Sequence, residues 1–168
     1  MKALLAACAM AGVLFAQQFK FNLDHLAKKA SNTVDLALPQ NLVQLGAAML
    51  DGKDPDQAKA KKVVAGLQGI YIKSFEFKKE GEYTKADLDQ IRVQLKAPEW
   101  QRMVGVQSSE DRETLEVWVR TEGGKMTGLA ILASDPRELT VVNLVGSVDP
   151  SAITDLGGSF GIPKMKKK

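Results

Sequence analysis

Histidine and cysteine, the residues most used as catalytic bases, nucleophiles and metal ligands, each occur once among the 168 residues, as His25 and Cys8. A serine or cysteine nucleophile needs a base and a second group that orients the base. A structural zinc site needs three or four ligands, mostly Cys and His. A lone imidazole on a short N-terminal helix satisfies neither need, so we interpret His25 as a surface residue and expect no metal and no cofactor.

Carboxylates are the remaining candidates for chemistry. Glu80 and Glu82 resemble a pair of glycosidase acids, but acids flank most surface turns, so we interpret them as solvated. Asp51, Asp54 and Asp56 fail the spacing of a calcium loop and are better explained as a helix stop followed by a helix cap. A hydrolase that uses carboxylates alone stays open as the alternative, and it requires two acids about 5 to 9 Å apart in one pocket.

Two features point to recognition rather than catalysis. Trp118 and Arg120, beside Glu116, combine an aromatic ring with charged groups, a composition enriched at binding hot spots. Tyr71 extends this candidate interaction surface if its strand is a neighbour, which the sequence leaves open. The competing interpretation is a tryptophan covered by a helix.

The N-terminus has the pattern of a signal peptide. Lys2 supplies a positive charge, and residues 3–16 carry no charged side chain, which matches the charged and apolar regions of a secretory leader. The apolar run is shorter than the roughly 20 residues that span a bilayer. We expect cleavage between Ala16 and Gln17, and therefore an exported protein of the periplasm or cell envelope.

Membrane contact has two further candidate sources. Cys8 resembles the cysteine of a lipoprotein box, but the apolar run continues beyond it, which disfavours lipidation. The tail at residues 164–168 contains four lysines and is typical of a solubilising end, with contact to anionic lipid as the alternative. The formal net charge of +3 gives no reason to expect nucleic acid.

The mature chain has the length of one domain and predicts an α+β fold. Helical spacing marks N-terminal helices, one of them carrying Leu42, Leu45, Ala48 and Met49, and a capping box at Thr84 begins another. The expected division is 1–16 signal peptide, 17–66 N-terminal helical part, 67–163 sheet core with a short C-terminal helix after Pro150, and 164–168 basic tail. We expect a mainly antiparallel sheet of about five strands packed with helices, its last strands joined as a meander.

The strands differ in how they should be covered. Alternation in residues 115–120 predicts one buried face and a place near an edge. Residues 129–133 and 141–145 are apolar at nearly every position, which predicts cover on both faces. The N-terminal helices, the C-terminal segment or a second protein chain must supply the second layer.

Several short sequence segments resemble a known family. They are residues 69–77, 80–83, 120–123 and 138–146, and the chain is similar through them to the bacterial family called domain of unknown function 4252, from the first mature helix to Pro163. Membership would imply an exported protein, often encoded near extracytoplasmic-function sigma and anti-sigma factors, with no assigned activity or functional residues.

These observations favour a non-enzymatic envelope protein whose sheet binds a protein partner or a small ligand. The apolar late strands and the shortage of catalytic groups motivate this hypothesis, which the sigma and anti-sigma association would place in signalling. The alternative is the carboxylate-dependent periplasmic hydrolase.

Overall fold

A computed structural model describes residues 23–96 and 99–147. The signal peptide, Cys8, the Ala16 to Gln17 cleavage site, the C-terminal helix and the basic tail are predictions that lie outside the described residues. The described helices are α1 (Asp24–Ala27), α2 (Gln40–Met49), α3 (Pro55–Ala65) and α4 (Lys85–Gln94). The described strands are β1 (Asn32–Pro39), β2 (Leu67–Glu76), β3 (Trp100–Ser108), β4 (Glu113–Glu122), β5 (Lys125–Asp135) and β6 (Glu138–Gly146).

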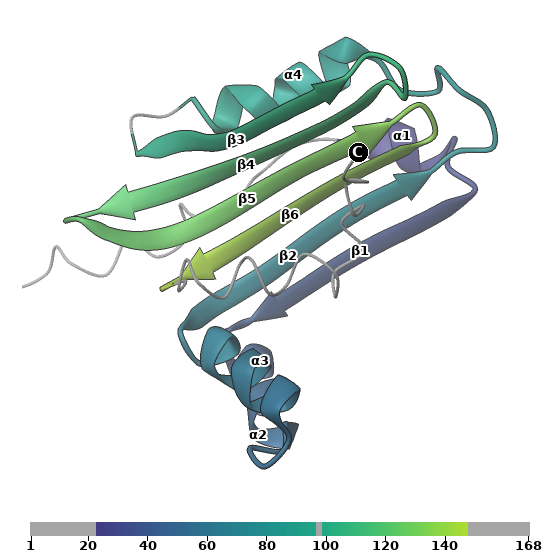
Figure 1. Cartoon of the computed structure of the whole chain (residues 1–168). Coiled ribbons are helices and arrows are strands. Elements are labelled where there is room, and N and C mark those ends of the chain that lie inside the picture. Colours follow the sequence, from purple (N-terminus) through teal and green to yellow (C-terminus); the bar gives the residue numbers. More distant parts are fainter. Residues whose placement is uncertain (1–22, 97–98, 148–168) are drawn as a thin grey trace, which may run out of the picture.

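The described strands form one antiparallel sheet of six strands in the order β1-β2-β6-β5-β4-β3 (Figure 1). The predicted α+β class and the meander from β3 to β6 are confirmed. The expected number of about five strands was too low, because β1 pairs along its whole length with β2. β4 lies next to the edge strand β3, and therefore near an edge of the sheet as predicted.

Two helix starts follow the predicted capping chemistry. The Asp54 side chain accepts hydrogen bonds from the backbone N–H groups of Asp56 and Gln57, both at 2.9 Å, and Pro55 follows it at the start of α3. At α4, Thr84 and Asp87 form the reciprocal capping box. These side chains satisfy backbone donors that have no partner within the first turn of a helix.

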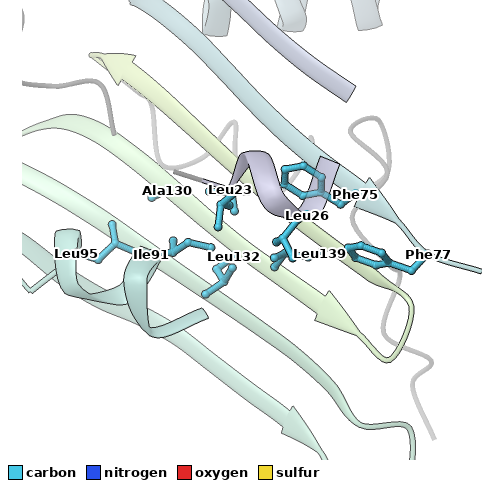
Figure 2. Packing of buried hydrophobic residues seen from close by; sticks show 10 residues of the cluster. Leu23, Leu26, Phe75, Phe77, Ile91, Leu95, Ala130, Leu132 and Leu139 are labelled. Carbon is cyan, nitrogen blue, oxygen red and sulfur yellow. The ribbon is translucent and has the colours of Figure 1, made fainter. Parts of the chain in front are cut away.

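One face of the sheet, here called the first face, is covered by α1 and α4. Figure 2 shows Leu23 and Leu26 from the α1 segment gathered with Ile91 of α4 and Leu95, the residue after α4, over Leu132 of the sheet. All five side chains are at most 1% exposed. Burying them removes a large apolar area from water, which is the main stabilisation available to a fold of this size.

The opposite face, here called the second face, has its own apolar cluster. Its buried members on the strands are Leu67, Ile70, Val119, Leu129, Ile131, Val142 and Leu144. The described residues of this cluster that come from helices are Val43 of α2 and Val64 of α3. Helix α2 contacts β1 and β2, and the α2–α3 pair lies at one end of the sheet and extends away from the strands (Figure 1). The two-sided apolar strands therefore have a core on each face, as predicted.

Candidate partner-binding surface

Helix α2 presents an apolar stripe to solvent. Leu42, Leu45 and Met49 are 43%, 59% and 81% exposed, and their spacing of three and four residues places them on one side of the helix. Val43 and Ala47 are the buried residues of α2 and lie on the side that faces the sheet. The helix contains no charged residue, so it lacks the charged face that a surface helix of a soluble domain normally has.

The sequence pattern identified these positions as a helical stripe but gave no sign that it would face outward. Because α2 carries apolar residues on both sides, its periodicity cannot distinguish the side that packs on the sheet from the side that does not. The absence of charge along ten residues was the signal that could have revealed the second stripe. We call Leu42, Leu45 and Met49 the α2 stripe.

The surroundings of the α2 stripe combine polar and apolar groups. In α3, Lys59, Lys61 and Lys62 are exposed, and Lys61 Nζ donates a hydrogen bond to the Leu50 carbonyl at 3.5 Å. Strand β1, which leads directly into α2, exposes Val34 (46%) and Leu36 (37%) at an edge of the sheet. An apolar patch with a polar rim is typical of an interaction site.

The residues proposed from sequence as an interaction surface share the first face but are spread across it. Trp118 lies opposite Ala130, Ala130 opposite Asn143, and Asn143 opposite Tyr71. Directly opposed residues project to the same face, so β5 and β6 separate Trp118 from Tyr71 by about 14 Å at ordinary strand spacing. Arg120 follows two positions after Trp118 and its Nη2 lies 2.5 Å from Glu122 Oε1.

Trp118 is held by structural contacts. It packs against the first-face cluster, its Nε1 donates to Glu116 Oε2 at 3.2 Å, and the Arg102 guanidinium carbon lies 5.8 Å from its ring centroid. The Arg92 guanidinium on α4 donates to Glu116 Oε1 through Nε at 2.9 Å and Nη2 at 2.6 Å, and this carboxylate raises the pKa of Arg92. These contacts tie α4 to β4.

His25 forms one specific contact. Its Nε2 lies 2.7 Å from Asp87 Oδ1, while Asp87 Oδ2 accepts hydrogen bonds from the backbone N–H and the hydroxyl of Thr84, both at 2.8 Å. The hydroxyl therefore bonds the carboxylate rather than the imidazole, which is not the order of a nucleophile, base and orienting acid. The arrangement joins the start of α4 to α1, and the His25 side chain is 47% exposed.

Among the acids considered for catalysis, Glu80 has a charged partner in the structure. Glu80 pairs with Arg112 at 2.6 Å on the surface, and this guanidinium lowers the pKa of Glu80. The buried acids among residues 23–96 and 99–147 are Asp87 and Glu116. Asp87 caps α4, and Glu116 binds Arg92. In the same part of the chain, no group of three or more His, Cys, Asp or Glu side chains is placed to hold a metal ion.

The comparisons with known proteins give a family. The family model described as Domain of unknown function (DUF4252) matches residues 26–156. The chain belongs to this family. This confirms the resemblance read from the sequence, over a slightly shorter range. A search of the curated proteins found no match, and the described helices include none with the length and hydropathy needed to cross a membrane.

Proposed function

We propose that this DUF4252 protein is exported and acts in the periplasm or cell envelope as a non-enzymatic protein that binds a protein partner through the α2 stripe. The observation that carries the proposal is an uncharged helix with only two buried side chains and three exposed large apolar ones. Exposure of these apolar side chains to water is unfavourable, and burial against a partner would remove that unfavourable free energy.

The chemistry of the stripe favours a protein over a small ligand. Sites for small molecules are concave and enclose most of the ligand, whereas the α2 stripe is the outer side of a helix. A helix that offers anchors at three- and four-residue spacing fits an apolar groove on another protein. Met49, with its flexible thioether, suits such a surface, and burying Leu45 and Met49 would contribute about 1.5 to 3 kcal/mol each.

The non-enzymatic part of the proposal is supported by the positions of the carboxyl groups. Asp87 and Glu116 each accept several hydrogen bonds from neighbouring structural groups. An acid and a nucleophile or base of a glycosidase instead face a common substrate across a short gap. The alternative hydrolase would need such a pair.

Site-specific photo-crosslinking tests the partner. A photo-reactive amino acid is placed at position 45 in the full chain, and the matched control carries it at position 93 of α4, where Val93 is 62% exposed. We expect an adduct of one defined protein from position 45 in intact cells, with no such adduct from position 93. The adduct should disappear when Met49→Glu is added.

Other outcomes contradict the proposal. A product of twice the chain's mass would show self-association, a lipid adduct would show membrane contact, and equal labelling from both positions would show no specific surface. The family resemblance implies genes for anti-sigma factors nearby, so an anti-sigma factor that reaches the envelope is the first candidate to identify in a specific adduct.

Intact-mass measurement of the protein purified from the envelope tests export separately. We expect a chain that begins at Gln17. A retained leader would contradict export, and a lipid-bearing chain that begins at Cys8 would replace the soluble form with a lipid-anchored one.

A further inference from the structure

The centre of the second face is buried more completely than the described helices explain. Leu129 and Ile131 on β5 are 1% and 6% exposed, and Val142 and Leu144 on β6 are both 4% exposed. Helix α2, which brings Val43 to this cluster, contacts β1 and β2. Strand β5 is two strands away from β2, about 10 Å at ordinary spacing, so another layer must cover β5.

The layer that covers the second face is narrow. In the same face, Val34 and Leu36 at the β1 edge are 46% and 37% exposed, and Val104 at the β3 edge is 37% exposed. A broad partner such as a second sheet would cover the edges as well as the centre. The burial is also present within a single chain, so it points to a strip of this same chain that runs along β5 and β6.

The course of the chain at the end of β6 shows where that strip begins. Gly146 has φ of +120°, and a Cβ at this position would lie 2.5 Å from the Gly66 carbonyl oxygen. Such a backbone angle and such a close approach both require glycine. The next residue, Ser147, donates its backbone N–H to the same carbonyl at 2.9 Å, so the chain leaves the strand direction at the end of the sheet beside Leu67.

We propose that residues 148–163 fold back along the second face and pack on the central strands β5 and β6. The sequence carries Ile153 and Leu156 at helical spacing after Asp149-Pro150, followed by Phe160 and Ile162. The family match continues ten residues beyond β6, to residue 156. Residues 148–156 of this segment therefore lie within the family match.

The length of this segment fits the face. A helix over residues 149–156 would span about 12 Å, and an extended course over 157–163 would add about 23 Å. The eleven residues of β5 span about 36 Å, so the segment matches the length of the central strands.

Methyl NMR on the full chain tests the proposal without altering it. We expect cross-peaks between the methyl groups of Ile153 or Leu156 and those of Ile131 or Val142. Cross-peaks to Leu132 or Leu139 on the first face would overturn the proposal, as would the absence of any contact to the sheet. Cross-peaks seen only between differently labelled molecules in a mixed sample would assign the cover to a second copy.

A pair of variants gives an independent readout. Ile153→Asp with Leu156→Asp should expose the Ile131 and Val142 methyl groups to a soluble paramagnetic agent, with the Leu132 and Leu139 methyl groups still protected. The matched control, Lys166→Asp with Lys167→Asp in the tail, should leave both faces protected. Unchanged protection of Ile131 and Val142 in the first variant would overturn the proposal. If that variant fails to fold, the methyl cross-peaks of the unmodified chain provide the test.

Discussion

The ion pair between Arg92 and Glu116 offers a measurable test of how α4 is held on the sheet. The Glu116 side chain is 5% exposed and the Arg92 side chain 23% exposed. Removing the guanidinium with Arg92→Met leaves a buried carboxylate that keeps one donor, the Trp118 indole. Loss of one partner from a buried pair costs about 3 to 5 kcal/mol, and we expect the lower end because solvent reaches Arg92 and Trp118 remains.

The expected change is large in a thermal melt. A loss of about 3 kcal/mol lowers the Tm of a chain of this length by roughly 6 to 12 °C. Circular dichroism during heating and urea unfolding measure the Tm and the free energy of unfolding. The double variant Arg92→Met with Glu116→Met should recover most of the loss, to within about 1 kcal/mol of the parent, because two apolar side chains replace both charges.

The matched control is the exposed pair between Arg112 and Glu80. Its closest N–O distance is also 2.6 Å, but the two side chains are 63% and 46% exposed. We expect Arg112→Met to leave the Tm unchanged within error, since exposed pairs stabilise little. The reasoning is refuted if Arg92→Met behaves like Arg112→Met, or if the double variant is as unstable as the single one.

Three further predictions concern a cap, a glycine and the α2 stripe. Burial alone would raise the pKa of Asp87, but hydrogen bonds from Thr84 and the contact with His25 lower it overall. The ionised Asp87 carboxylate therefore stabilises the folded state above about pH 4, and this stabilisation is lost as the pH falls through the folded-state pKa. Asp87→Asn should therefore flatten the dependence of unfolding free energy on pH below about pH 4, and an unchanged slope would contradict the assignment. Gly146→Ala should destabilise the fold by about 1 to 3 kcal/mol. Gly46→Ala, at a helical position with no atom within 4 Å of the added Cβ, should instead stabilise it by about 0.5 to 1 kcal/mol. Equal effects of the two variants on the free energy of unfolding in urea would disprove the distinction. Met49→Glu should remove the specific crosslink from position 45 at unchanged stability, within about 0.5 kcal/mol, and a large fall in Tm would show that the stripe serves the fold instead.

Local chemistry carried the successful sequence predictions. The Asp54 cap and the Thr84 capping box are visible in the sequence because a cap involves residues at most three positions apart. Apolar residues at nearly every position of β5 and β6 likewise required cover on both faces, wherever those strands lay. The family could be recognised for the same reason, from contiguous phrases such as residues 138–146.

The candidate surface depended on contacts that no local pattern contains. The α2 stripe and the buried Val43 side are both apolar, and only the docking of α2 against β1 and β2 decides which side meets water. The contact of Arg92 with Glu116 joins residues 24 positions apart, and that of His25 with Asp87 joins residues 62 positions apart. Such pairs are absent from any short window of sequence.

The sequence by itself determined the α+β class, the family, the caps and the shortage of histidine and cysteine. Each of these depends on residue type or on near neighbours along the chain. The tertiary structure alone decided the strand order, the separation of Tyr71 from Trp118 by two strands, and the outward face of α2. Those features follow from which apolar surfaces meet when the chain folds, and burial is a property of the whole arrangement rather than of any one segment.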